Sequence, residues 1–161
     1  MISRRLFLAA VPLTLAGCTM RDVPASARTT VILVRHADRA GDILNETGRR
    51  RAAALPALLA EYPLDAIYSP DIGRNLETAE PLSQATGLPV TIIPKENAGA
   101  QMTSDHPDGT VIWVGNKGNL RTIWEELGGP GTAPQEYGEV AVLELLENGA
   151  RRATRLIVDP V

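Results

Sequence analysis

The sequence is poor in the residues that form disulfides and zinc sites. Cys18 is the single cysteine among 161 residues, so it has no partner for a disulfide within the chain. His36 and His106 are the only two histidines, and neither belongs to a cluster of cysteines and histidines. We therefore expect no structural or catalytic metal site and no bound cofactor.

The sequence also lacks an excess of basic residues. It carries 16 Lys and Arg against 19 Asp and Glu, a net charge of −3. Without residues 1–17, which contain two arginines, 14 basic residues face 19 acidic ones and the net charge is −5. This balance argues against nucleic acid as a partner. Internal repeats and low-complexity segments are missing too, and the remaining 144 residues suit one ordinary domain.

Residues 1–17 have the pattern of an export signal. Arg4 and Arg5 precede an apolar stretch, 6–16, that is too short to span a bilayer. Ser-Arg-Arg-Leu-Phe-Leu resembles a twin-arginine signal, and Leu15-Ala16-Gly17-Cys18 resembles the lipobox of bacterial lipoproteins. The alternatives are an uncleaved anchor and a buried N-terminal helix. The charged start and the small residues at the end favour the export signal over both.

The lipobox resemblance divides the chain into three parts. We expect a signal peptide at 1–17, a polar tether at 18–28 and a folded domain at 29–161. In lipoproteins the lipobox cysteine is lipidated, so the resemblance implies a lipid anchor on Cys18 with the membrane as its partner. The expected location is the bacterial cell envelope, facing the periplasm or the exterior.

Strand and helix patterns alternate along the rest of the sequence. Asn45 is a suitable helix N-cap, Pro56 should kink or weaken the helix it enters, and Asn148-Gly149 is a strong hairpin turn. The predicted strands are 30–34, 66–68, 90–93, 110–114, 137–146 and 152–158, and the predicted helices are 46–61, 72–86, 97–102 and 120–127. This order predicts an α/β fold, a three-layer α/β/α sandwich with a mostly parallel central sheet and a C-terminal hairpin.

Two of these strands are almost uniformly apolar and should lie at the centre of the sheet. Strand 30–34 ends in Arg35-His36, and strand 110–114 ends in Gly115-Asn116. Ligands of open α/β sheets bind beyond the carboxyl ends of the strands. We expect the two ends to border one site for an anionic ligand, although Arg35 and His36 alone are also compatible with a strand that simply ends in solvent.

Four segments of the sequence, 34–37, 44–49, 67–80 and 111–116, carry motifs in a fixed order. Together they resemble the histidine phosphatase superfamily, whose members have a phosphoglycerate mutase-like fold. Residues 34–37, Val-Arg-His-Ala, match its nucleophile motif, and 44–49 resemble the segment that opens its first helix. Residues 67–80 carry Ser69, Arg74 and Thr78-Ala79 at the family spacing. Residues 111–116 resemble the strand that leads to the second catalytic histidine. The resemblance covers nearly all of 29–158.

The resemblance implies hydrolysis of a phosphomonoester through a phosphohistidine. His36 would be the nucleophile, and Arg35 and Arg74 would hold the phosphoryl oxygens with their forked donors. An attacking imidazole nitrogen must be unprotonated, so the other ring nitrogen needs an acceptor such as a backbone carbonyl. The implied partner is a phosphorylated small molecule or a phosphoprotein.

The sequence departs from the family at Asn116, which stands where the second histidine is expected. Asn116 can still donate a hydrogen bond to the phosphoryl group, but it carries no charge. Loss of one preorganised donor lowers rates by about 10²–10³-fold. Lys117 follows, and we expect its side chain to point to solvent, since lysine is almost never buried unpaired. His106, in a Pro-Asp-Gly turn, is predicted to be a surface loop residue.

The general acid has no motif of its own, and Glu96, Asp38 and Asp42 are the candidates. Three functions remain open at this point. The chain is a weak or specialised phosphohydrolase using His36, a module that binds phosphorylated ligands without turnover, or an envelope lipoprotein that keeps only the fold. Arg35, His36 and Arg74 argue against the third, while Asn116 does not decide between the first two.

Overall fold

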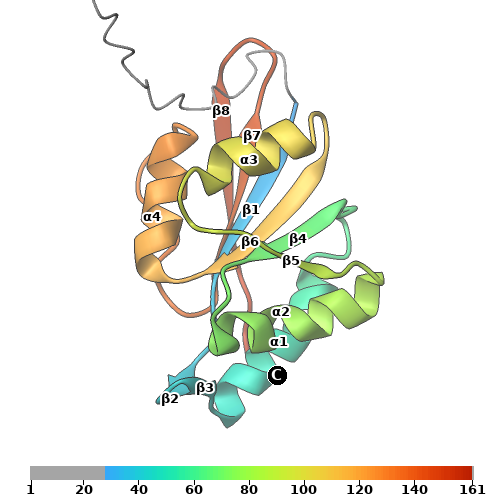
Figure 1. Ribbon diagram of the computed structural model, residues 1–161, viewed down its shortest axis with the longest axis vertical. Helices are drawn as coiled ribbons and strands as arrows, with labels where there is room; N and C mark the ends of the chain where they lie inside the picture. Colours follow the sequence, from blue (N-terminus) through green and yellow to red (C-terminus); the bar gives the residue numbers. More distant parts are fainter. Residues whose placement is uncertain (1–27, 161) are drawn as a thin grey trace, which may run out of the picture.

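The computed structural model describes residues 28–160, which form one α/β domain (Figure 1). Its six-stranded sheet has the order β5-β4-β6-β1-β7-β8. The strands are β1 (Thr30–Arg35), β4 (Ala66–Ser69), β5 (Val90–Ile92), β6 (Thr110–Gly115), β7 (Glu139–Leu145) and β8 (Arg151–Ile157). Neighbouring strands from β5 to β1 are parallel, and β7 is antiparallel to both β1 and β8. The predicted parallel sheet with a C-terminal hairpin is confirmed.

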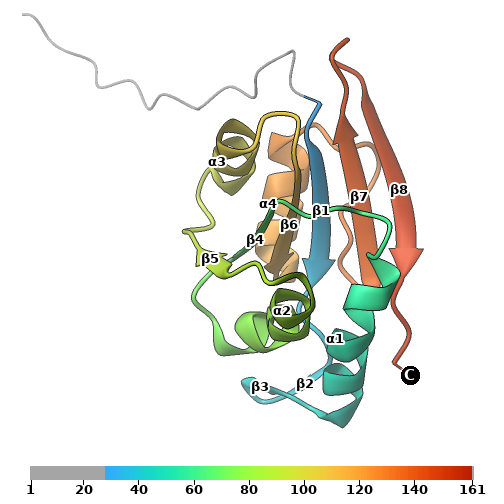
Figure 2. The same cartoon turned by 90° about the vertical axis from the view of Figure 1, so that its right-hand side faces the viewer.

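β1 and β6 lie in the middle of the sheet, as their apolar sequences predict. Val31, Ile32 and Leu33 of β1 have no exposed surface. The two strands pair in parallel from Thr30 opposite Thr110 to Arg35 opposite Gly115. Their carboxyl ends are therefore adjacent, at the lower end of the molecule in Figure 2, where β1 and β8 point down and β7 points up.

Two pairs of helices cover the two faces of the sheet, as predicted. The helices are α1 (Glu46–Leu58), α2 (Gly73–Thr86), α3 (Ala98–Asp105) and α4 (Lys117–Glu126). Leu55 of α1 and Leu82 of α2 pack with Ile32 and Val34 on one face. Met102 of α3 and Trp124 of α4 belong to the core on the other face. Side chains alternate along β1, so the position after Arg35 continues the face that α1 and α2 cover.

Several predicted boundaries are wrong by a few residues, each for a local reason. α1 runs through Pro56 and ends at Leu58 rather than near 61, because the Ala60 N–H donates to Ala57 in a tighter, three-residue turn. α4 begins at Lys117 rather than near 120, because Asn116 and Asn119 form a reciprocal capping box at its start. β7 begins at Glu139 rather than at 137, because Gly138 adopts a φ of +85° and turns the chain just before it.

A small hairpin between β1 and α1 has no counterpart in the sequence-based prediction. It consists of β2 (Arg39–Ala40) and β3 (Ile43–Leu44), each two residues long. Strands this short are below the length at which alternation of apolar residues is recognisable. The hairpin lies beyond the carboxyl end of β1 (Figure 2), and the charge of Arg39 in β2 acts on His36.

The predicted signal peptide, 1–17, and the predicted tether up to residue 27 lie outside the described residues. Among the helices of residues 28–160, none has both the length and the apolar character needed to cross a membrane.

Candidate active site

His36 sits directly beyond the central strand β1, on the sheet face covered by α1 and α2. Its backbone N–H donates to the carbonyl of Gly115 at 2.7 Å, which extends the β1–β6 pairing by one residue. Its side chain is only 2 % exposed. His36 is therefore a fixed, buried group at the carboxyl edge of the sheet, where ligands of open α/β folds bind.

The hydrogen bond of the His36 ring determines which nitrogen can react. Nδ1 lies 2.9 Å from the carbonyl oxygen of Ala37. A carbonyl accepts but cannot donate, so Nδ1 carries the proton and Nε2 of the neutral ring is free. The expectation of a backbone acceptor for the second ring nitrogen is confirmed.

The surroundings of His36 also favour the neutral ring. Burial is the largest influence and lowers the pKa of His36 below its usual 6.5, and the nearby charges of Arg35, Arg74 and Arg39 lower it further. The hydrogen bond to Ala37 opposes this shift without reversing it. The acid limb of any reaction that uses neutral His36 should therefore lie below pH 6.5.

The loop that precedes β7 holds the side chain of Arg35 through two contacts. Its Nη1 donates to the carbonyl of Gln135 at 3.1 Å, and its guanidinium carbon lies 3.8 Å from the ring centre of Tyr137. The Tyr137 ring is also 5.7 Å from the His36 ring, centre to centre. A guanidinium stacked on an aromatic ring is oriented as a flat fork, which suits recognition of a phosphoryl group.

Arg74 reaches the same region from the first turn of α2. Its charge contributes to the lowered pKa of His36, and its nearest acidic partner is Asp42, 3.7 Å away and almost fully exposed. Within residues 28–160 the buried Nε atoms of Arg35 and Arg74 have no hydrogen-bond partner. The structure thus brings His36, Arg35 and Arg74 together, with donor capacity left for an anionic ligand.

Asn116 follows β6 as His36 follows β1, but its side chain also has a structural task. It is the N-cap of α4, where its Oδ1 accepts from the N–H of Asn119 at 3.3 Å. Its own N–H donates to Oδ1 of Asn119 at 2.9 Å. The cap uses the amide oxygen of Asn116 and leaves the NH₂ group as the donor that can serve a ligand.

Lys117 and His106 do not supply the charge that Asn116 lacks. Lys117 forms an exposed ion pair with Glu136 at 2.9 Å, so the prediction that it points to solvent is confirmed. His106 is at the end of α3, before the amino end of β6, and its Nε2 lies 3.0 Å from the hydroxyl of Tyr68. It is partly buried there rather than a plain surface loop residue, because it packs against the Tyr68 ring.

A pocket of about 410 Å³ opens beside Asn116, between the carboxyl ends of β4 and β5 and the first turns of α4. Lys95, Glu96 and Arg121 line it together with Asn116. His36 is not among its lining residues, so the pocket adjoins the histidine site through Asn116. Of the three acid candidates, Glu96 is the one that the structure places in this pocket.

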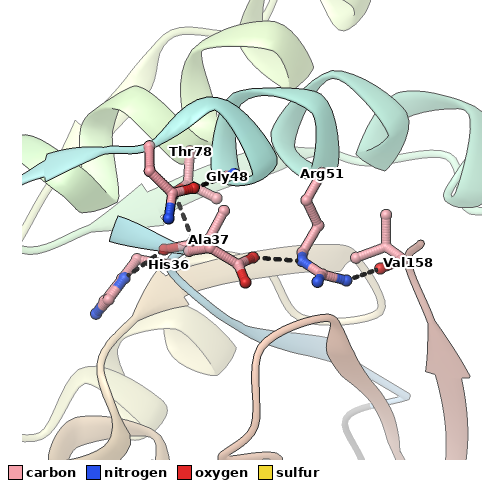
Figure 3. A network of polar contacts seen from close by, with 8 residues as sticks. His36, Ala37, Gly48, Arg51, Thr78 and Val158 are labelled. Carbon is pink, nitrogen blue, oxygen red and sulfur yellow. Dashed lines mark hydrogen bonds and ion pairs between the residues drawn. The ribbon is translucent and has the colours of Figure 1, made fainter. Parts of the chain in front are cut away.

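The segment that follows His36 is fixed by contacts from α1 (Figure 3). Arg51 donates from Nε to the carboxylate of Asp38 at 2.7 Å and from Nη1 to the carbonyl of Val158. Gly48 packs against the same segment so closely that a Cβ there would be 1.9 Å from the Asp38 carbonyl oxygen. The close contact explains why the segment that opens α1 needs glycine at position 48. The ion pair with Arg51 occupies the carboxylate of Asp38 and removes it from the candidates for general acid.

Tyr137 and Thr78 are site residues whose roles were missed in the sequence. The sequence pattern predicts Tyr137 in a strand, but it lies in the loop before β7, and Gly138 is the turn signal for that loop. Thr78 was noted for its spacing, but its contact with the backbone of Ala37 depends on how α2 packs against the end of β1. For metals, the described part of the chain contains no group of three or more His, Cys, Asp or Glu side chains arranged to hold an ion.

Comparisons with known proteins point in one direction. Residues 27–95 match the sequence model of the histidine phosphatase superfamily, branch 1. The solved structure of Bacillus stearothermophilus YhfR shares 20 % identity with a TM-score of 0.63, covering 78 % of this chain and 95 % of that one. The protein histidine phosphatase SixA, complexed with tungstate, shares 17 % identity with a TM-score of 0.62, covering 81 % and 97 %.

A further similar structure is a mycobacterial glucosyl-3-phosphoglycerate phosphatase bound to inorganic phosphate. It shares 19 % identity with a TM-score of 0.58, covering 83 % of this chain and 97 % of that one. A comparison with curated protein sequences gives no match. At these identities the structural likeness establishes the phosphoglycerate mutase-like fold, and the residues of the site have to carry the chemistry.

Proposed function

We propose, from the premise that this chain belongs to the histidine phosphatase superfamily, that it hydrolyses phosphomonoesters through a phosphohistidine on His36. The observation that carries the proposal is the state of the His36 ring. Nδ1–H donates to the Ala37 carbonyl, and burial and the neighbouring arginines lower the pKa of His36, so Nε2 is an unprotonated nucleophile at neutral pH. Among the structures of similar fold, the mycobacterial glucosyl-3-phosphoglycerate phosphatase acts on a phosphomonoester, in agreement with this class of substrate.

In the first step, Nε2 of His36 attacks phosphorus as the bond to the leaving oxygen breaks. Arg35 and Arg74 bind the equatorial phosphoryl oxygens and stabilise the charge there. The leaving alkoxide takes a proton, for which we propose the carboxyl group of Glu96 in the adjoining pocket. In the second step, water gives a proton to the Glu96 carboxylate and attacks the phosphohistidine, which releases inorganic phosphate and restores the free imidazole and the Glu96 carboxyl group.

We propose that turnover is weak because of Asn116. A neutral NH₂ group replaces a cationic imidazole beside the phosphoryl group, and its orientation is tied to the cap of α4. Removing a preorganised donor lowers rates by about 10²–10³-fold, and a neutral substitute should recover part of this. The leaving group would occupy the pocket lined by Lys95, Glu96 and Arg121, which can accept part of a small molecule or of a phosphoprotein side chain.

The alternative is a protein that binds phosphorylated ligands without turning them over. The capping of α4 by Asn116 favours it, because this residue has a structural reason to be present without any catalytic role. The arginines alone would then provide binding. His36 with its free Nε2 weighs against this alternative, since binding alone does not need a neutral histidine.

The proposal predicts that the wild-type protein forms a phosphohistidine. Incubation with an aryl phosphate and an alkaline quench should trap phosphate on His36 in a base-stable, acid-labile form, together with slow release of phenol. Vanadate, which mimics the transferring group, should raise the melting temperature. Absence of both turnover and trapped phosphate would leave only the binding alternative, and an unchanged melting temperature with vanadate would exclude that as well.

We further propose that the protein is exported and anchored in the cell envelope by a lipid on Cys18. This rests on the lipobox resemblance of residues 15–18. A Cys18→Ser variant expressed in a bacterium should move from the membrane fraction to the soluble fraction, because the lipid is its attachment to the membrane. The Asn116→Ser variant, which keeps residues 15–18 intact, is the matched control and should stay in the membrane with the wild type. Equal fractionation of Cys18→Ser and wild type would contradict the anchor.

A further inference from the structure

Two hydrogen bonds connect the His36 ring to α2 by way of Ala37 (Figure 3), and a third follows within the helix. The ring Nδ1 lies 2.9 Å from the Ala37 carbonyl, and the Ala37 N–H donates to Oγ1 of Thr78 at 3.0 Å. The Thr78 hydroxyl in turn donates to the carbonyl of Arg74 at 2.8 Å. One buried hydroxyl therefore lies between the segment that holds the nucleophile and the helix turn that carries Arg74.

The direction of the Ala37 carbonyl decides which His36 nitrogen keeps its proton. That carbonyl belongs to a residue held at both ends. Its N–H is fixed by Thr78, and the next residue, Asp38, accepts from the Asn45 N–H at 3.0 Å and from Arg51 at 2.7 Å. The Asp38 end holds the chain against α1, so Thr78 is the contact that holds it against α2.

The Thr78 hydroxyl has a fixed orientation. Its single proton is used on the Arg74 carbonyl one helical turn earlier, an arrangement common for threonine in helices. This leaves the lone pairs of Oγ1 to accept, and the Ala37 N–H points at one of them. The side chain is 2 % exposed, so water has no ready access to replace it. A threonine with only a structural role in α2 would need the bond to the Arg74 carbonyl but not the bond from the Ala37 N–H.

We propose that Thr78 is a positioning residue. It sets the tautomer of His36 and fixes the position of the His36 ring relative to Arg74. This rests on the proposed function, because it concerns the nucleophile of that reaction. Thr78 holds the Ala37 backbone so that its carbonyl accepts from Nδ1–H of His36, and it joins this backbone to the helix turn of the phosphate-binding arginine. A displacement of about 1 Å at a reacting atom can lower a rate by 10²-fold.

The test compares Thr78→Val, which removes both hydrogen bonds at nearly constant shape, with Thr78→Ser, which keeps both. Thr86→Val is the matched control, since the Thr86 hydroxyl makes the same bond one turn back in α2, to Leu82, and is remote from His36. We expect Thr78→Val to lower kcat by about 10–100-fold with a smaller change in the affinity for vanadate. Thr78→Ser should stay within about threefold of wild type, and Thr86→Val should not change kcat.

The tautomer itself is read from ¹⁵N NMR of the imidazole rings. The chain has only two histidines, so a His106→Gln variant assigns the His36 signals. Wild type and Thr78→Ser should show a protonated Nδ1 and a free Nε2, and Thr78→Val should show a mixture of tautomers. If Thr78→Val does not fold, Thr78→Ala loses the same two bonds with less crowding and replaces it.

The two proposals can fail separately. An unaltered ring spectrum and unaltered kcat in Thr78→Val or Thr78→Ala would overturn the positioning role, even in an active enzyme. A wild type without turnover would overturn the proposed function, while the NMR comparison, which needs no turnover, would still decide whether Thr78 sets the tautomer.

Discussion

Replacing His36 with alanine should reduce the hydrolysis of an aryl phosphate to the rate without protein, by about 10³-fold or more, and should eliminate the trapped phosphoprotein. The reason is that His36 supplies the only nucleophile in the proposed reaction, and removal of a covalent nucleophile removes most of the chemical rate enhancement. Steady-state hydrolysis and alkaline-quench labelling measure the two effects.

Binding should respond differently from turnover in this variant. Arg35 and Arg74 remain, so vanadate or phosphate should still raise the melting temperature of His36→Ala. His106→Ala is the matched control, because it removes the other histidine, which contacts Tyr68 away from the site. Turnover by His36→Ala at the wild-type rate would show that another group is the nucleophile, and the proposed mechanism would be wrong.

The sheet could be predicted because its signals are local. The uniform apolar runs at 30–34 and 110–114 indicated central strands, and the structure confirms both, with β1 and β6 paired along their whole length. The position of Arg35-His36 beside Gly115-Asn116 followed from that pairing. Asn45 as N-cap and the turn at Asn148-Gly149 were also readable, since each depends on residues next to it in sequence.

The parts of the site that could not be predicted depend on contacts between distant segments. The stacking of Tyr137 on Arg35 joins residues about a hundred positions apart, and the spacing of apolar residues along the sequence does not predict such a contact. The family resemblance marks Asn116 only as a substitute for histidine and does not predict that its side chain caps α4. The capping box with Asn119 starts α4 three residues early and gives Asn116 a second function.

Replacing Asn116 with histidine should raise kcat on an aryl phosphate by about 10–10³-fold, because it adds a charged, preorganised donor where charge develops. The gain should depend on pH. His36 must be neutral, and its lowered pKa keeps it so down to below pH 6.5. The introduced imidazole must be protonated, so its contribution should be largest at acidic pH and should decline as the pH rises through its own pKa. Rate profiles from pH 5 to 9 measure this difference from wild type.

The same substitution should lower stability, because Asn116 caps α4. Loss of an N-cap costs about 0.5–2 kcal/mol, so the melting temperature of Asn116→His should fall while its activity rises. Asn116→Ser is the matched control, since its hydroxyl can accept from the Asn119 N–H but cannot replace the amide NH₂ as a donor of the same reach. It should keep the stability of wild type and lose part of the turnover. If Asn116→His loses stability and gains no activity at any pH, Asn116 does not face the phosphoryl group, and its cap is then the whole of its role.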